Sequence, residues 1–229
     1  MSTHSPKRAL LRSLASLAQA CAHEHRLELL EHMAQREQSV EALAQRTSLS
    51  LANTSQHLQL LRRAGLAESR RDGRHVFYRL ADDVAVVQLI ESLRHVAEQQ
   101  MAEVQRLMAT QLHTMDAFEP MDADTLMRLL AEHAVTVIDV RPEDEYVSGH
   151  MAGAINVPPG SLARDAADLP RDKLVVAYCR GPYCVMSFEA VQHLRTLGFD
   201  VQRFATGYPQ WKAAGLPTET GDGDSVHRG

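Results

Sequence analysis

The chain has 229 residues, of which 45% are hydrophobic and 23% charged, and its formal net charge is −5. It is long enough for two small domains, and no apolar run approaches the roughly 20 residues that a transmembrane helix needs. Three cysteines are too few for a disulfide framework, and the N-terminal segment is amphipathic without a long apolar stretch, so we expect a cytoplasmic protein with no membrane contact.

The charge is distributed unevenly along the chain. Residues 1–80 carry 12 Lys and Arg against 7 Asp and Glu, whereas residues 116–229 carry 10 against 17. A basic first part and an acidic second part predict that only the first part faces a polyanion.

The first part is helical by pattern. Apolar residues three and four positions apart predict helices in RALLRSLASLAQA, HRLELLEHM and VEALAQRT. Ser50 is placed to cap a further helix over 51–63, and Gly65 to end it. Two strand-like runs, LAESRRDG and RHVFYRL, flank the turn signal Asp72–Gly73. One long helix is predicted from Asp82 to about Met115, because the segment contains no Gly or Pro.

The second part has a different pattern. Short β-rich runs (VTVIDV, AINVP, LVVAYC and VQRFA) alternate with helical segments near Pro142–Val147 and Met186–Leu197. Strands separated by helices predict a parallel sheet covered on both faces. We therefore predict a mainly-α domain over residues 1–115, an α/β domain over 116–220 and a disordered tail over 221–229.

The order of three helices, a fourth helix and a hairpin is typical of a winged helix-turn-helix, whose later helix enters the major groove while the wing follows the DNA backbone. The candidate reading residues are Asn53, Thr54, Ser55, Gln56 and His57, whose side chains can contact base edges or phosphates. The candidate phosphate contacts of the wing are Arg70, Arg71 and Arg74. A solvated polar helix beside a charged hairpin is the alternative interpretation.

The string SLSLANTSQHLQLLRRAGLAESRRDGRHVFYRL resembles the ArsR/SmtB family of winged-helix repressors, and the resemblance covers roughly residues 10–112. It implies a homodimer that binds palindromic double-stranded operator DNA and releases it when an inducer binds. An apolar stripe on the predicted long helix is able to pair with a second copy or to form intramolecular core. Its members are Ile90, Leu93, Ala97, Met101, Val104 and Met108.

The metal sites of that family are incomplete in this sequence. The segment VEALAQRT, which precedes the recognition helix, contains no cysteine. The long helix offers Asp82, His95 and Glu98 as ligands, but Val84 stands where a histidine is needed and valine cannot bind zinc. Cys21 is the one cysteine of this part, which excludes an internal dithiol switch and favours a part-buried helix residue. We therefore predict no metal and no cofactor.

The stretch CRGPYC, residues 179–184, follows the apolar run LVVAY and precedes a helical segment. A thiol between a buried strand and a helix faces backbone N–H groups and the positive end of the helix, which stabilise an anion and lower the pKa of a thiolate. Cys179 holds that position, and Arg180 adds positive charge. A single C-x4-C pair cannot complete a zinc site. Two buried structural cysteines remain the alternative.

Three motifs in order, VIDVRPEDEYVSGHMAGAINVP, VVAYCRGPYC and GYPQWKAAGLP, closely resemble the rhodanese domain over about residues 118–217. The resemblance implies an α/β fold in which Cys179 accepts a sulfane sulfur as a persulfide and passes it to a nucleophile. The loop that would hold the sulfur comprises Arg180, Gly181, Pro182, Tyr183, Cys184 and Val185.

Other residues match the family by position. Asp139 and Arg141 correspond to its DVR motif, where we expect an ion pair between Arg141 and Glu145. Trp211 and Pro217 match the closing motif, where we expect packing roles.

The loop also departs from the family. Thiosulfate-using members commonly end the loop with a basic residue, whereas this chain has Cys184, and we expect about two extra residues before a helix near Ser187. Less positive charge predicts weak thiosulfate turnover. A second thiol predicts new chemistry, because Cys184 is able to attack a Cys179 persulfide and release sulfide, leaving a disulfide, or to hold a polysulfide bridge.

Three functions follow from these observations. The leading hypothesis is a sulfur-responsive transcription repressor whose partners are operator DNA and a small inorganic sulfur species or persulfide donor. The alternative is a rhodanese-type sulfurtransferase whose DNA-binding part controls its own expression. The third, a metal-responsive repressor, is disfavoured by Val84. The first two differ in whether modification of Cys179 changes operator affinity.

Overall fold

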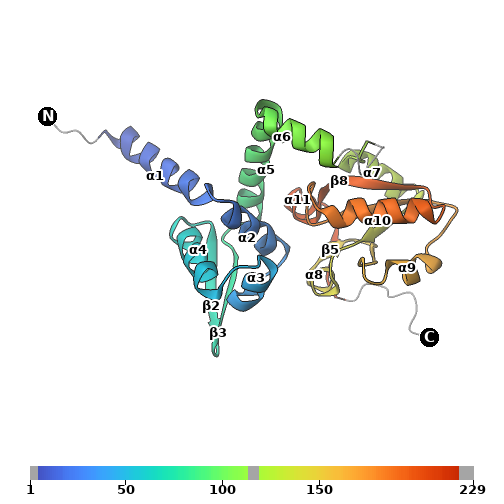
Figure 1. Cartoon of the computed structure of the whole chain (residues 1–229), viewed down its shortest axis with the longest axis horizontal. Helices are drawn as coiled ribbons and strands as arrows, with labels where there is room; N and C mark the ends of the chain where they lie inside the picture. The colour runs from blue at the N-terminus through green and yellow to red at the C-terminus, as the bar shows by residue number, and fades with distance from the viewer. Residues whose placement is uncertain (1–4, 113–118, 222–229) are drawn as a thin grey trace. The chain divides into compact units, whose positions relative to one another are not determined.

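The computed structural model describes residues 5–112 and 119–221 of the chain, which forms two compact units, Met1–Ile90 and Glu91–Gly229 (Figure 1). Within the described residues, no helix has both the length and the apolar character that a membrane span requires. Residues 113–115 of the predicted long helix, and the predicted tail after Gly221, lie outside the described ranges.

The first unit combines helices with a small antiparallel sheet. Its helices include α1 (Pro6–Cys21), α2 (Glu24–Gln35), α3 (Val40–Arg46) and α4 (Leu51–Arg63), and its strands β1 (Gln38–Ser39), β2 (Ala67–Asp72) and β3 (His75–Leu80). The strands lie in the order β1-β3-β2, and β2 and β3 form the predicted hairpin. Gly73 adopts a φ of 57° in the turn, a conformation that glycine reaches without steric cost.

Helix α4 begins and ends where the sequence predicts. The side chain of Ser50 accepts a hydrogen bond from the backbone N–H of Asn53 at 3.3 Å, which satisfies one free donor of the first turn. Gly65, at a φ of 76°, follows the last turn. The inner face of α4 is buried at Leu58 and Leu61, so the helix is held by core packing as well as by its caps.

The predicted long helix is not continuous. Helix α5 (Asp83–Gln100) ends at Met101, whose backbone is extended, and α6 (Ala102–Leu107) and the π-helical turn η1 (Met108–Leu112) follow. The side-chain amide of Gln105 donates to the carbonyl of Gln99 at 3.1 Å across the break. This side-chain bond satisfies a carbonyl at the end of α5, where the helical ladder stops.

The core of the second unit is a four-stranded parallel sheet, as predicted. Its strands are β4 (Val135–Asp139), β6 (Ile155–Asn156), β7 (Leu174–Cys179) and β8 (Val201–Gly207), in the order β6-β4-β7-β8. Its helices include α7 (Ala123–Ala131), α8 (Glu143–Ser148), α9 (Leu162–Asp165), η2 (Ala166–Asp168), α10 (Val185–Thr196) and α11 (Tyr208–Ala213). A small ladder joins β5 (His150–Met151) to β9 (Thr218–Glu219).

Alternation along β7 gives the sheet two buried faces. Val175, Ala177 and Cys179 belong to a core that includes Val191 and Leu194 of α10. Val176 and Tyr178 belong to a second core on the opposite face, which includes residues of α7 and α11. Because successive side chains of a strand point to opposite faces, Cys179 ends the strand on the α10 side. The strand therefore carries the cysteine to the start of that helix.

Candidate functional site

The outward face of α4 differs from the run of polar residues that the sequence suggested. Asn53 and Gln56 are exposed, as a DNA-reading role requires. Thr54 is fully buried, and its hydroxyl donates to the carbonyl of Ser50 at 3.0 Å, so its side chain belongs to the inner face. Gln59 and Arg63 are exposed and follow Gln56 at helical spacing, a signal that the sequence contained and that our prediction missed.

His57 lies in a group of imidazole rings at the edge of α4. Its ring centroid is 4.6 Å from that of His23 and 6.1 Å from that of His25. Burial lowers the pKa of His57, and the nearby His23, Arg26 and His25 lower it further. Half-buried and in ring contact, His57 is less available to DNA than Asn53. Ser55 is also half-buried and accepts a weak bond from Gln59.

The three wing arginines are not equivalent. Arg70 pairs with Glu37 at 2.7 Å and with Asp72 at 3.1 Å, and its guanidinium lies over the ring of Phe77. These hydrogen bonds, that to Glu37 first, raise the pKa of Arg70. Arg71 and Arg74 form no ion pair within the described residues. The wing therefore presents Arg71 and Arg74 as the cations that remain for phosphate.

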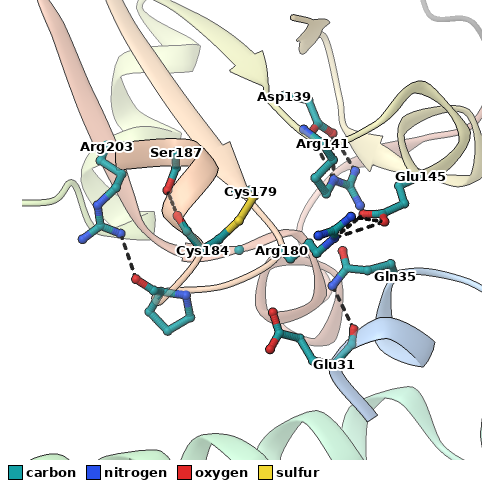
Figure 2. The surroundings of a disulfide bond; sticks show 12 residues. Glu31, Gln35, Asp139, Arg141, Glu145, Cys179, Arg180, Cys184, Ser187 and Arg203 are labelled. Carbon is teal, nitrogen blue, oxygen red and sulfur yellow. Dashed lines mark hydrogen bonds and ion pairs between the residues drawn. A yellow bond between two sulfur atoms is a disulfide. The ribbon is translucent and has the colours of Figure 1, made fainter. Parts of the chain in front are cut away.

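The two cysteines of CRGPYC form a disulfide bond, with their Cα atoms 6.2 Å apart (Figure 2). Cys179 is the last residue of β7 and Cys184 is the N-cap of α10, which begins at Val185. The prediction of two further residues before the helix is therefore wrong: the turn closed by the Cys184 N–H and the Gly181 carbonyl leads directly into the first helical turn. Cys21, by contrast, is a free, buried thiol whose pKa is raised by burial.

The N-terminus of helix α10 lies at Cys184, which is its N-cap residue. The cysteine side chain caps no backbone group, and the first N–H groups of a helix have no intrahelical acceptor. The hydroxyl of Ser187 donates to the carbonyl of Cys184 at 2.8 Å and fixes the cap. The positive end of the helix thus acts on the second cysteine, whereas the sequence suggested the first.

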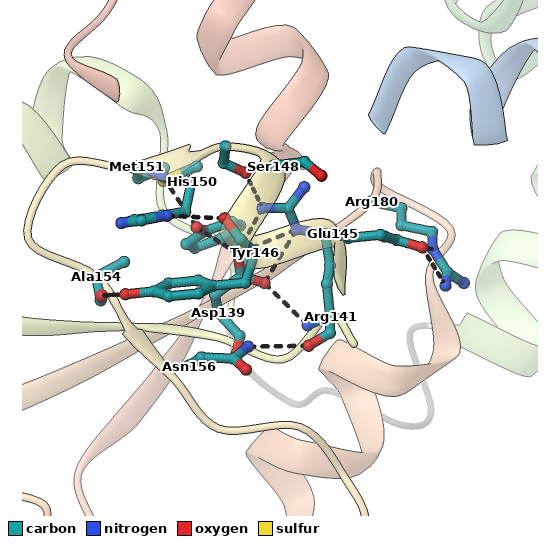
Figure 3. Close-up of polar contacts among 12 residues, drawn as sticks. Asp139, Arg141, Glu145, Tyr146, Ser148, His150, Met151, Ala154, Asn156 and Arg180 are labelled. Atoms are coloured by element: carbon teal, nitrogen blue, oxygen red, sulfur yellow. Dashed lines mark hydrogen bonds and ion pairs between the residues drawn. The ribbon is translucent and has the colours of Figure 1, made fainter. Parts of the chain in front are cut away.

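The basic side chain of the loop, Arg180, is held in an ion pair with a buried carboxylate. Arg180 donates to both carboxylate oxygens of Glu145, with a closest distance of 2.7 Å, and Glu145 is fully buried (Figure 3). Arg141 pairs with the buried Asp139 at 2.6 Å and donates to the Gly149 carbonyl. Arg141 is thus paired with Asp139 and Arg180 with Glu145, and the predicted partner of Arg141, Glu145, also favours its charged form.

Electrostatics hold the Arg141 side chain charged. Burial alone would lower the pKa of Arg141. The carboxylate of Asp139, with a smaller effect from Glu145, outweighs burial, so the pKa of Arg141 is raised overall. Tyr178 donates to Asp139 at 2.6 Å, and burial followed by that carboxylate raises the pKa of Tyr178. The DVR motif is therefore a buried structural network, as expected for Asp139 and Arg141.

Two residues of β8 set the backbone path of the loop. Arg203 donates to the carbonyl of Pro182 at 3.4 Å while its guanidinium lies over Phe188. A Cβ atom on Gly207 would lie 2.4 Å from the carbonyl carbon of Arg180 and 2.4 Å from the nitrogen of Gly181. Only glycine allows β8 to approach the loop this closely. Neither residue was singled out from the sequence.

The closing motif packs as predicted at Trp211, whereas Pro217 is exposed and contributes its backbone carbonyl. Trp211 is buried, and its indole N–H donates to the carbonyl of Pro217 at 2.7 Å.

In the parts of the chain that the structure describes, no three His, Cys, Asp or Glu side chains are grouped so that they could hold a metal ion.

Comparison with known proteins agrees with both halves of this description. The helix-turn-helix domain family matches residues 22–70, and the rhodanese-like domain family matches residues 122–214. The HTH-type transcriptional regulator Rv0324 of Mycobacterium tuberculosis is 42% identical over 219 residues, which cover 94% of each chain. The chain belongs to the ArsR-type winged-helix transcriptional regulators that carry a C-terminal rhodanese domain. Both resemblances seen in the sequence are thereby confirmed.

Two further relatives each match one part of this regulator. Thiosulfate sulfurtransferase GlpE of Shewanella oneidensis is 29% identical over 103 residues, 44% of this chain and 98% of that protein. A homodimeric winged helix-turn-helix DNA-binding domain from Mycobacterium bovis, solved in solution, is 36% identical and covers 45% of this chain and 95% of its own, with a TM-score of 0.40.

The close approach of β8 to the loop yields a stability prediction. Gly207→Ala should lower the free energy of unfolding of the second unit by about 1–3 kcal/mol, because the new methyl group must displace loop backbone rather than a flexible side chain. Denaturant unfolding followed by the fluorescence of Trp211, the single tryptophan, measures this unit. Gly160→Ala, whose Cβ would meet nothing within 4 Å, is the control and should change stability little. Equal stability of the two variants would contradict the prediction.

Proposed function

We propose that this transcriptional regulator is a repressor that responds to sulfane sulfur, with Cys179 as the sulfur acceptor and Cys184 as the resolving thiol. The observation that carries the proposal is the disulfide between these residues in a rhodanese loop, on the same chain as a winged helix. The pair supplies a chemical switch, and the winged helix supplies the output.

The proposed chemistry takes two steps from the reduced pair. In the first, the Cys179 thiolate attacks the outer sulfur of thiosulfate, forming a persulfide and releasing sulfite; a polysulfide donor reacts in the same way and releases the shortened polysulfide. In the second, the Cys184 thiol loses its proton and attacks Cys179 Sγ. The S–S bond of the persulfide breaks, hydrosulfide leaves, and the disulfide forms. The two protein sulfurs are oxidised, and the sulfane sulfur is reduced to sulfide.

A sulfurtransferase is the second candidate, supported by the similarity to thiosulfate sulfurtransferase GlpE across the rhodanese part. Two features of the loop weigh against sustained turnover. Arg180 is paired with Glu145, and Cys184 is positioned to remove the persulfide before an external acceptor does. A transferase would keep one operator affinity in all sulfur states, whereas a sensor would not.

For DNA binding, we propose that a dimer reads its operator with the exposed face of α4 and holds phosphates with the wing. The apolar stripe supports the dimer, because Leu93 and Met101 are about half exposed, at 46% and 52%. No member of the stripe is buried within the described chain, so its apolar area is available to a second copy.

We also propose a route by which a change in the loop is transmitted to α5. Within the unit Glu91–Gly229, Tyr183 of the loop donates to Glu98 of α5 at 2.6 Å, and partial burial followed by this bond raises the pKa of Tyr183. Glu98 in turn pairs with Arg94 at 2.8 Å. Tyr183 lies between the two cysteines in sequence, so we propose that opening their bond changes the contact with α5, which carries the first three members of the apolar stripe, Ile90, Leu93 and Ala97.

The DNA-binding proposal predicts separable effects of two sets of substitutions. Arg71→Ala and Arg74→Ala should each weaken binding to all sequences and reduce the slope of log K against log salt by about 2 for the dimer, because each removes one phosphate contact per protomer. Gln56→Ala should instead reduce discrimination between a selected operator and random DNA. The control is the double change Glu37→Gln with Arg70→Gln, which removes an ion pair at constant net charge and should leave the slope unchanged. Slopes unaffected by Arg71→Ala and Arg74→Ala would refute the wing assignment.

The sulfur chemistry predicts distinct products in three cysteine variants. After reduction and treatment with polysulfide or thiosulfate, Cys184→Ser should accumulate about 32 Da per added sulfur on Cys179, because no second thiol resolves the persulfide. Cys179→Ser should take up no sulfur and lose any operator response, and Cys21→Ser should behave as wild type. Mass spectrometry of the intact variants decides the assignment. Uptake by Cys179→Ser at Cys184 or Cys21 would contradict it.

The coupling proposal predicts a variant that reacts with sulfur but does not respond. Wild type should differ at least about fivefold in operator affinity between the reduced and disulfide forms, which is the lower end of usual coupling. Tyr183→Phe keeps the ring but loses the hydroxyl bond to Glu98, so its two forms should bind alike. Mass spectrometry should show that this variant still forms the disulfide at the wild-type rate. A full response in Tyr183→Phe would rule out the route through Glu98.

A further inference from the structure

The two sulfurs of the disulfide differ in their surroundings. Cys179 is 1% exposed and lies in the apolar core between the sheet and α10. Cys184 is only partly buried and packs at the edge of that core. Its neighbours in the chain, Tyr183 and Val185, are 43% and 47% exposed. One end of the bond is therefore enclosed by protein, and the other lies near solvent.

The charges at the two ends differ as well. Cys184 is the N-cap of the 12-residue helix α10, whose positive end attracts an approaching anion. Thiol–disulfide exchange begins with the attack of a thiolate on one sulfur of the bond, and access is among the factors that decide which sulfur is attacked. In this oxidised form an external thiolate therefore meets a more exposed sulfur and a favourable field at Cys184, whereas Cys179 is enclosed by the core.

We propose that the disulfide is reopened from Cys184 by a low-molecular-weight thiol, which returns Cys179 to the thiolate state first. The external thiolate bonds to Cys184 Sγ, the Cys179–Cys184 bond breaks, and its electron pair leaves on Cys179. A second external thiolate then attacks the external sulfur of the mixed disulfide. Cys184 leaves as a thiolate and the external thiol is oxidised to its own disulfide. Two external thiols are oxidised for each protein disulfide reduced, so electrons balance.

This inference rests on the proposed function, because an oxidised pair cannot accept sulfur and a sensor needs a path back to its receptive state. It adds a second role for Cys184: besides resolving the persulfide, this residue is the one that the external thiol attacks. It also places the protein in a sequence of reactions, in which a thiol-oxidising step must follow each sulfur response.

The sequence separates the two sulfurs for measurement. Trypsin cleaves after Lys173, Arg180 and Arg195, so Cys179 lies in peptide 174–180 and Cys184 in peptide 181–195. The oxidised full-length chain is exposed briefly to glutathione, quenched in acid, denatured, treated with N-ethylmaleimide and digested. We expect glutathione on 181–195 and maleimide on 174–180, in at least about tenfold excess over the reverse pattern. Glutathione on 174–180, or equal labelling of both peptides, would overturn the proposal.

A second measurement decides the matter if the mixed disulfide is too short-lived to trap. Cys179→Ser and Cys184→Ser are each converted to the mixed disulfide with thionitrobenzoate, and its release by glutathione is followed by absorbance. Release from Cys184 should be at least about tenfold faster than from Cys179. Equal rates, or faster release from Cys179, would refute the assignment. Sulfur uptake by the reduced Cys184→Ser variant, read as added mass on 174–180, tests the proposed function separately, so either idea can fail alone.

Discussion

The carboxylate of Glu145 is fully buried, and a buried carboxylate is strongly destabilising unless a cation and further donors satisfy it. Arg180 provides that cation, although it is also the one basic residue between the two cysteines. Its guanidinium therefore serves to stabilise the buried carboxylate of Glu145. What remains for an anionic sulfur in this loop is backbone N–H groups, the N-terminus of α10 and a second thiol. Under the proposed function, this distribution of charge favours thiol exchange over repeated turnover of an anionic donor.

Much of the fold was predictable because local signals agreed with the tertiary structure. The cap at Ser50, the stop at Gly65 and the turn at Asp72–Gly73 each act over a few residues, and all three were placed correctly. The break at Met101 was not predictable in this way, since no Gly or Pro marks it and the compensating bond comes from the Gln105 side chain. The helices α7, α9 and α11 were missed, although α7 has a local signal: Asp122 at its N-cap accepts a hydrogen bond from the backbone N–H of Thr125 at 2.8 Å.

The candidate site shows the same division. Thr54 was misplaced by treating five consecutive residues as one face, although a helix turns about 100° per residue and cannot present them together. That error was avoidable from spacing alone. The ion pair of Arg70 could not be predicted from spacing, because its partner Glu37 lies far away in sequence and meets it only in the folded unit. Likewise, the order of the cysteines predicted a reactive pair, whereas their unequal burial depends on where β7 ends and α10 begins.

Under the proposed function, a resolving thiol changes what kind of signal the DNA-binding part can receive. A persulfide on a lone cysteine lasts only until an acceptor removes it, so occupancy follows the donor concentration of the moment. A disulfide persists after the donor has gone and is reversed only by thiols. The state of the pair then reflects the balance between oxidising sulfur and reducing thiol. A reversible inducer must bind one state about 10⁴-fold more tightly to move a population from 1:99 to 99:1. A disulfide must favour one state by the same ratio, but it stays on each molecule until a thiol removes it. The proposed C-x4-C switch can therefore act without a separate inducer pocket, in a chain whose Cys179 lies at a buried strand end and is bonded to Cys184.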